Sequence, residues 1–154
     1  MGPTSDRSHC NLPRDSLVPE KWNPRMTTEL TVLTLAGLLQ ILQFCAYSFT
    51  ANQQVSRRVA LGPRDEPVTL TGTAGRFKRA MENHFEGLIL FTIACLVVTL
   101  GDQSTTTTQT CAWIYLGARI AYVPAYALGL SPWRSVIWFI GLLATTSMLI
   151  AALI

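Results

Sequence analysis

The chain has 154 residues, of which 49% are hydrophobic and only 14% charged, whereas a soluble domain carries about 25% charged residues. The formal net charge is +3, and almost all charged side chains lie outside four long apolar stretches. This distribution excludes a soluble globular domain. Nucleic acid is not an expected partner either, because no basic face with interleaved aromatic residues occurs.

Residues 1–25 carry four prolines among Ser, Asp, Arg and Asn, and they show no apolar periodicity. Such a segment cannot bury enough apolar surface to fold, so we predict a disordered polar tail ahead of a membrane domain over residues 26–154. The tail is not expected to be a signal peptide, since the apolar stretch that follows it is long enough to cross a bilayer. Met1 and Met26 are both possible starts of translation.

The first apolar stretch runs from about residue 30 to 51, close to the roughly 20 residues that cross the hydrocarbon core. Gln40 and Gln43 interrupt it, and amide side chains in a span prefer a helix–helix interface to lipid. Three further stretches follow at residues 76–100, 112–130 and 136–154, and the first of these becomes apolar only at Gly87. We therefore predict an all-α protein with four transmembrane helices in a bundle.

The four cysteines form no CxxC pair, and two of them, Cys45 and Cys95, lie inside apolar stretches. Cysteine in such a position behaves as a small hydrophobic residue. His9 and Cys10 are adjacent in the tail but lack partners at ligand spacing. We expect neither a disulfide framework nor a metal site.

Basic residues are unevenly distributed between the two ends of the predicted bundle. The connector between the second and third spans holds none, whereas the turn before the fourth span holds Arg134. Because lysine and arginine stay on the cytoplasmic side, both chain ends should face away from the cytoplasm. Four basic residues of the tail count against this orientation, unless Met26 is the start. The first loop and its margin hold Arg57, Arg58, Arg64, Arg76, Lys78 and Arg79.

Polar stripes occur on the second and third predicted spans, where a charge costs at least about 2.5 kcal/mol on insertion scales. The first stripe is spaced i, i+4 and i+7, which places its residues within about 60° on a helix that turns ~100° per residue. The second stripe shares a face by the same arithmetic, and Arg134 begins the fourth span at the same end of the bundle. The stripes are Arg79, Asn83 and Glu86, and then Arg119, Tyr122 and Tyr126.

These residues also have a structural interpretation. Arg79 and Glu86 can be interfacial anchors, and Arg119 with Glu86 can form a buried ion pair that fixes helix register. His84 lies one step off the Arg79 face, which favours a packing or headgroup role over a catalytic one. Six convergent polar groups nevertheless favour a binding cavity, and they are Arg79, Asn83, Glu86, Arg119, Tyr126 and Arg134. Three arginines are suited to bind carboxylates, phosphates or a thiolate, and an acid is suited to bind an ammonium group. Glutathione combines carboxylates, an amine and a thiol.

At these residues the chain resembles the MAPEG superfamily, the membrane-associated proteins in eicosanoid and glutathione metabolism. The segment RAMENHFE at residues 79–86 is similar to the family signature R-A-x-x-N-x-x-E. ARIAYVPAY at residues 118–126 is similar to A-R-x-x-Y-x-x-x-Y, and Arg134 and Ser135 follow at the family spacing. The resemblance covers about residues 26–154. It looks closest to the bacterial branch, which implies a bacterial inner-membrane location.

The resemblance implies a homotrimer of four-helix bundles, with the co-substrate glutathione held between neighbouring subunits near the cytoplasmic face. It implies that Arg134 is the catalytic residue that stabilises the glutathione thiolate, and that Glu86 lies near the glutathione amine. Tyr122 stands where some members have histidine, and Trp138 replaces smaller residues or tyrosine, which bears on the pocket for the second substrate. The other implied glutathione-binding residues are Arg79, Asn83, Arg119, Tyr126 and Ser135.

The leading hypothesis is a glutathione-dependent transferase or peroxidase that acts on hydrophobic electrophiles or lipid hydroperoxides entering sideways from the bilayer. The alternative is a non-catalytic membrane protein of the same fold that binds thiols or lipids, since fold does not determine function. A four-span exporter would want an acid deep in a span, whereas Glu29 and Glu86 lie near span ends. The sequence leaves open which electrophile is used and whether the thiol is glutathione.

Overall fold

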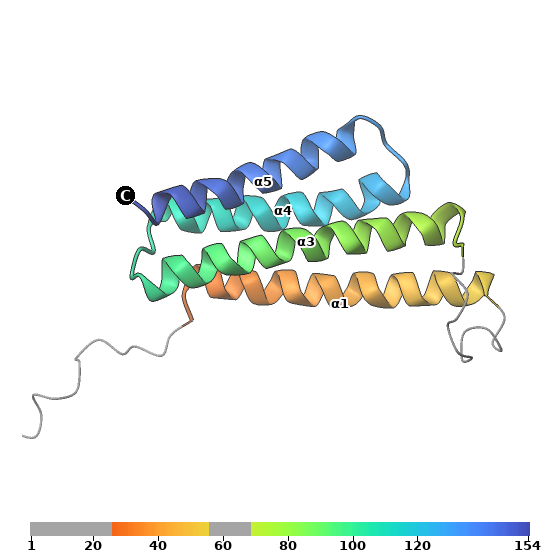
Figure 1. Ribbon diagram of the computed structural model, residues 1–154, viewed down its shortest axis with the longest axis horizontal. Coiled ribbons are helices and arrows are strands. Elements are labelled where there is room, and N and C mark those ends of the chain that lie inside the picture. The colour runs from red at the N-terminus through yellow and green to blue at the C-terminus, as the bar shows by residue number, and fades with distance from the viewer. Residues whose placement is uncertain (1–25, 56–68) are drawn as a thin grey trace, which may run out of the picture.

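Four helices make up the part of the chain that the structure describes, residues 26–55 and 69–154 of this computed structural model. They are α1 (Thr28–Gln54), α3 (Gly72–Leu100), α4 (Thr106–Ala127) and α5 (Trp133–Ala151). Figure 1 shows them in one elongated bundle, with α1 beside α3 and α4 beside α5. The predicted all-α four-helix bundle is confirmed. The predicted tail lies outside the described residues, as does most of the loop after α1.

Three of these helices, α1, α3 and α5, are long and apolar enough to cross a membrane. The 22 residues of α4 rise about 33 Å, which also matches the hydrocarbon core in length. Its composition is more polar, because its first turns are rich in threonine and Arg119 lies further along the helix. Hydropathy therefore supports three of the four predicted spans. The remaining helix, α4, lies in the same bundle as these three.

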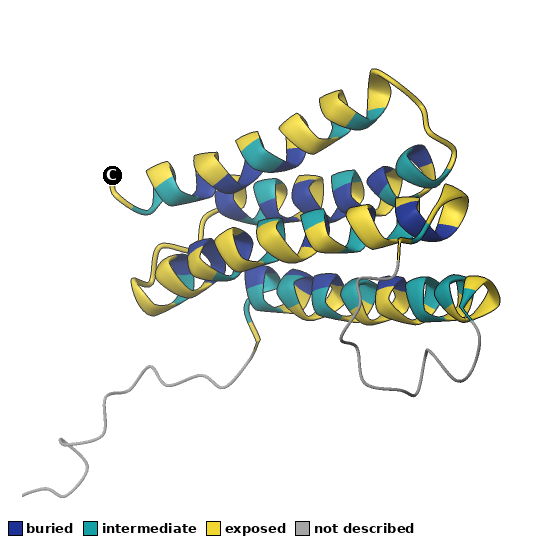
Figure 2. Ribbon diagram, turned by 45° about the vertical axis from the view of Figure 1, so that its right-hand side comes forward, coloured by how far each residue is buried: buried dark blue, intermediate teal, exposed yellow. Residues whose placement is uncertain are grey.

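The outer faces of the bundle are apolar. Figure 2 shows buried residues on the faces that the helices turn toward one another and exposed residues on the outside. Large apolar side chains such as Leu42, Phe49 and Ile150 are more than half exposed. An apolar surface of this extent is typical of a protein that contacts lipid, since lipid tails are as apolar as leucine.

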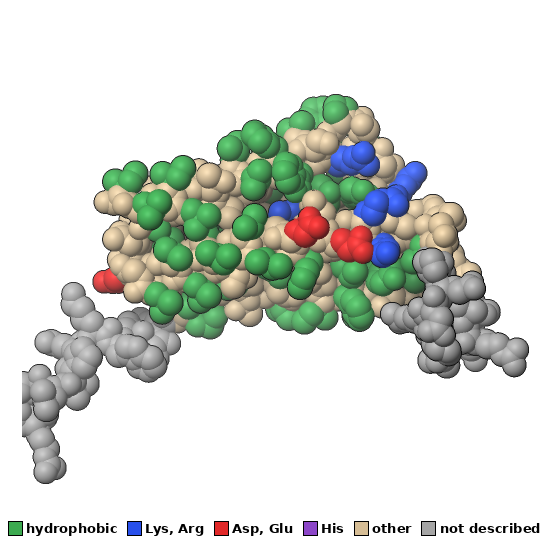
Figure 3. Space-filling view, viewed as in Figure 1, with side chains coloured by type: hydrophobic (Ala, Val, Ile, Leu, Met, Phe, Trp, Pro, Cys, Tyr) green, Lys and Arg blue, Asp and Glu red, His purple; other side chains and the backbone are tan. Residues whose placement is uncertain are grey.

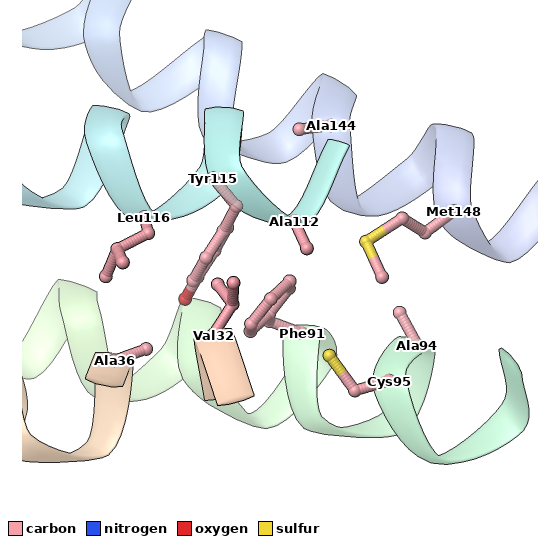
Figure 4. Packing of buried hydrophobic residues seen from close by; sticks show 10 residues of the cluster. All are labelled: Val32, Ala36, Phe91, Ala94, Cys95, Ala112, Tyr115, Leu116, Ala144 and Met148. Carbon is pink, nitrogen blue, oxygen red and sulfur yellow. The ribbon is translucent and has the colours of Figure 1, made fainter. Parts of the chain in front are cut away.

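All four helices contribute to one core (Figure 4). The rings of Phe91 from α3 and Tyr115 from α4 stack with centroids 3.9 Å apart and an angle of 10° between their planes. Val32 from α1 and Met148 from α5 are fully buried in the same cluster. Small side chains let the backbones approach closely around this stack. They are Ala36, Ala94, Ala112 and Ala144.

The helices α1 and α4 begin at the same end of the bundle, and threonine caps both of them (Figure 1). Thr27 Oγ1 accepts a hydrogen bond from Leu30 N at 3.3 Å. Thr105 and Thr108 form a reciprocal capping box at the start of α4. Such caps satisfy backbone N–H groups that lack partners within the helix.

The Glu29 carboxylate joins these two helix starts, although the sequence places this residue only at a span margin. Glu29 is fully buried. Its Oε1 accepts hydrogen bonds from Thr108 Oγ1 at 2.6 Å and from Ser104 Oγ at 2.9 Å. An anion near the N-terminus of α4 also interacts favourably with the helix dipole. The carboxylate therefore ties α1 to the connector between α3 and α4 and to the first turn of α4.

The prediction that Gln40 and Gln43 face a helix interface is confirmed. Gln40 Nε2 donates to the carbonyl oxygen of Met81 at 3.3 Å. The buried Gln43 amide forms a hydrogen bond with Nδ1 of His84 at 2.6 Å, and His84 is itself 1% exposed. Both contacts join α1 to α3. The packing interpretation of His84 agrees with this position.

Candidate functional site

Charged side chains gather toward one end of the bundle. Figure 3 shows acidic and basic side chains together on the half where α3 begins and α4 gives way to α5, over α3 and its border with α4 and α5. The other half of this face is mostly hydrophobic. The charged residues that α3, α4 and α5 carry toward this end include Arg76, Lys78, Arg79, Glu82, Glu86, Arg119 and Arg134.

Arg119 of α4 lies at the centre of the candidate site. It is 3% exposed, and its Nη1 donates to the Asn83 Oδ1 of α3 at 3.2 Å. Its guanidinium carbon lies 5.1 Å from the centroid of the Tyr115 ring, within the range of a cation–π interaction. Its Nε has no hydrogen-bond partner. The side chain therefore keeps unused donor capacity inside the bundle.

No carboxylate balances the charge of Arg119 among the described residues. The only ion pair there joins Lys78 Nζ and Glu82 Oε1 at 3.6 Å, one turn apart on the surface of α3. Glu86 is exposed and does not pair with Arg119, so the interpretation of the two residues as a buried ion pair is wrong. A buried guanidinium without an acid is costly, and such charges inside membrane segments usually serve a function.

A second group of side chains connects α4 to α5. The rings of Tyr122 and Tyr126 have centroids 5.4 Å apart, and Tyr122 is 5% exposed. The Arg134 guanidinium carbon, from the first turn of α5, lies 5.2 Å from the Tyr126 ring centroid. Because Arg119 and Tyr122 are three residues apart on α4, the two groups lie on neighbouring turns of one helix face. Arg134 is thereby held over the end of this face.

The remaining predicted site residues lie on the surface of the single chain. Arg79 and Glu86 of α3 and Ser135 of α5 are exposed, and Asn83 between the first two is half-buried. The structure thus brings Asn83 to Arg119 and Tyr126 to Arg134. It leaves Arg79, Glu86 and Ser135 exposed on the surface of the single chain. The functional roles of all eight residues stay predictions.

Three residues that sequence reasoning did not assign to the site adjoin Arg119. Tyr115 lies beneath its guanidinium, and Gly87 of α3 and Gly141 of α5 both lie close to it. Gly87 immediately follows the motif residue Glu86, and this adjacency is the only signal in the sequence. A glycine next to a motif is too common a pattern to indicate a contact 32 residues away.

An open apolar hollow of about 400 Å³ lies between α1 and α3. None of the eight predicted site residues lines it, so the hollow is distinct from the arginine site. Its walls are mainly hydrophobic and carry one acid. They consist of Gln40, Ile41, Phe44, Met81, Glu82 and Phe85.

These observations define the class of the protein as a helical membrane bundle with a buried arginine beside a polar side chain of a second helix, and no acid of the described residues pairs with this arginine. Comparison with protein families assigns it more closely. The model of the MAPEG family matches residues 32–154, and the chain belongs to that family. Comparison with curated protein sequences found no significant match.

Proposed function

We propose that this membrane protein is a glutathione-dependent transferase or peroxidase that acts on hydrophobic electrophiles or lipid hydroperoxides. The observation that carries the proposal is the buried Arg119 guanidinium, which has an unpartnered Nε and, among the described residues, no acid to balance it. An anionic substrate would provide the missing charge. Glutathione has two carboxylates and an ionisable thiol, and a guanidinium binds carboxylates in a fork of two hydrogen bonds.

The proposed arrangement divides glutathione between the buried and exposed parts of the site. Glu86 and Arg79, which are exposed on α3, bind the amine and a carboxylate at the surface. Arg119 binds the other carboxylate inside the bundle, and Asn83 binds the peptide beside it. Tyr122 and Tyr126 line the path of the peptide along α4. Arg134 and the neighbouring Ser135 lie at the start of α5, where they face the sulfur atom.

Catalysis in this scheme depends on formation of the thiolate. A free thiol has a pKa of about 8.5, and a nearby guanidinium lowers the pKa so that the thiolate is populated at neutral pH. In the transferase reaction the sulfur forms a bond to an electrophilic carbon and displaces a leaving group such as chloride. In the peroxidase reaction the sulfur attacks the O–O bond, which gives an alcohol and a sulfenic acid. A second glutathione then converts the sulfenic acid to a disulfide and water.

The decisive experiment is a conjugation assay with the purified protein in detergent or lipid nanodiscs. With glutathione and a chlorinated nitrobenzene, we expect formation of the coloured thioether together with release of chloride. The matched control is Lys78→Ala, since Lys78 is an exposed residue on the same helix outside the site. Calorimetry with glutathione alone measures binding separately from turnover, and together with the assay it distinguishes an enzyme from a non-catalytic thiol-binding protein. Binding without turnover, also with cumene hydroperoxide, would identify a non-catalytic thiol-binding protein.

We also propose that the working form is a homotrimer. The exposure of Arg79, Glu86 and Ser135 leaves part of the site uncovered in a single chain, and a second copy would cover it. In the predicted orientation, with both chain ends away from the cytoplasm, this part lies near the cytoplasmic face. Native mass spectrometry in a mild detergent should show a species of three chains. A spectrum with monomer alone at concentrations that support turnover would contradict the shared site.

A further inference from the structure

Gly87 of α3 lies directly against the Arg119 guanidinium. A Cβ atom built on Gly87 would overlap Nη2 of Arg119 and lie 2.7 Å from its Cζ and 3.4 Å from its Nε. Ordinary contacts between carbon atoms begin at about 3.5 Å, so the guanidinium occupies the volume that a side chain at this position would fill. The absence of a side chain at Gly87 is therefore a requirement of the observed Arg119 position.

Another glycine lies close to the same guanidinium. A Cβ atom on Gly141 of α5 would lie 3.8 Å from Arg119 Nε and 3.9 Å from its Cζ, which is ordinary contact. Gly141 is buried, so α5 approaches α4 closely here. Gly87 of α3 and Gly141 of α5 therefore both lie next to the Arg119 side chain. Of these two positions, only Gly87 has no room for a methyl group.

We infer that Gly87 is a positioning residue that determines where the Arg119 guanidinium lies and thereby how the site holds its anionic substrate. This inference rests on the function proposed above. A methyl group at position 87 would displace the end of a flexible side chain, while the helix backbones can stay in place. The guanidinium would move away from α3, and the hydrogen bond to Asn83 would break.

The consequence for chemistry is a large effect from a small substitution. The Arg119 guanidinium would remain in the bundle, but its free Nε–H would point in a different direction. Misplacement of a binding group by about 1 Å can lower a rate by about 100-fold. We therefore expect Gly87→Ala to lower kcat/KM for conjugation by about 10-fold to 100-fold. The KM for glutathione should rise, because the displaced group binds charge that is already present in the ground state.

The matched control is Gly117→Ala on α4, because nothing lies within 4 Å of a Cβ atom at that position. Both substitutions replace a helical glycine by alanine and raise helix propensity in the same way. A double-mutant cycle isolates the contact with Arg119. If Gly87 acts through the guanidinium, Gly87→Ala should have little further effect in an Arg119→Met background, where residual glutathione binding is measured by calorimetry at high concentration.

A nuclear magnetic resonance measurement tests the positioning without any substrate. The Arg119 Nε–H signal, assigned by its loss in Arg119→Met, should shift strongly in Gly87→Ala and little in Gly117→Ala. An unchanged signal together with unchanged kcat/KM in Gly87→Ala would overturn the inference. If the wild-type protein neither binds nor conjugates glutathione, the proposed function fails. The shift of the Nε–H signal then still decides whether Gly87 positions the guanidinium.

Discussion

Replacement of Arg119 by methionine is expected to weaken glutathione binding severely and to make the ligand-free protein more stable. The guanidinium is buried, and no carboxylate in the part of the chain that the structure describes pairs with it. Without ligand, no ion pair offsets the free energy of its desolvation. Replacement of buried charged groups by apolar residues of similar volume is often neutral or stabilises a protein by about 1–4 kcal/mol. The loss of a buried charged partner from a binding site should weaken glutathione binding about 100-fold or more.

Two measurements on the same samples test this expectation. Thermal unfolding in detergent should give an equal or higher midpoint for Arg119→Met than for the wild type. Calorimetry should show no binding at glutathione concentrations that saturate the wild type. Lys78→Ala is the control for loss of a positive charge from an exposed position. A markedly lower unfolding midpoint for Arg119→Met would mean that the arginine stabilises the bundle, and the binding role would lose its main support.

Replacement of Arg134 by alanine is expected to lower turnover at least 10-fold while the affinity for glutathione changes little. If Arg134 stabilises the thiolate, its interaction grows only when the thiol ionises, and such interactions affect kcat more than binding. Replacement of Arg79 by alanine or Glu86 by glutamine should instead weaken binding, since these groups meet charges already present in the ground state. The three variants together separate the two kinds of role.

The thiolate provides a direct readout for Arg134, because it absorbs in the ultraviolet where a thiol does not. Titration of the enzyme–glutathione complex should show a higher thiol pKa in Arg134→Ala than in the wild type, since the stabilising charge is gone. Lys78→Ala is the control, because it removes a positive charge from an exposed position outside the site. Equal thiol pKa and equal turnover in Arg134→Ala would contradict the catalytic role. Loss of affinity in all three variants would make Arg134 one more binding residue.

The architecture was largely predictable from the sequence, because the length of an apolar stretch and the geometry of a helix leave little choice in a membrane. The glutamines of α1 were also placed correctly, since an amide avoids lipid wherever a helix interface is available. The contact between Asn83 and Arg119 follows the predicted convergence of two stripes. Periodicity within each helix was enough to predict that these residues share a face.

The contacts between helices were less predictable. Glu86 and Arg119 seemed suited to pair, but Glu86 lies on the exposed side of α3 and the Arg119 guanidinium turns toward Asn83 and Gly87. Rotation of α3 relative to α4 decides between these arrangements, and a sequence pattern along one helix contains no information on that rotation. The same reason explains why Gly87 was not recognised. Its importance arises only from the position of a side chain on another helix.

The buried carboxylate of Glu29 has a consequence for the order in which the chain can complete its fold. Its hydrogen-bond donors are Ser104 and Thr108, which follow it by 75 and 79 residues. During synthesis, α1 and α3 are made before either donor exists. Until then, the Glu29 carboxylate at the start of α1 is solvated or incompletely hydrogen-bonded. Only the arrival of the first turn of α4 closes this end of the bundle. A helical hairpin of α1 and α3 alone is therefore an unfinished unit, and the third helix to be made completes the first.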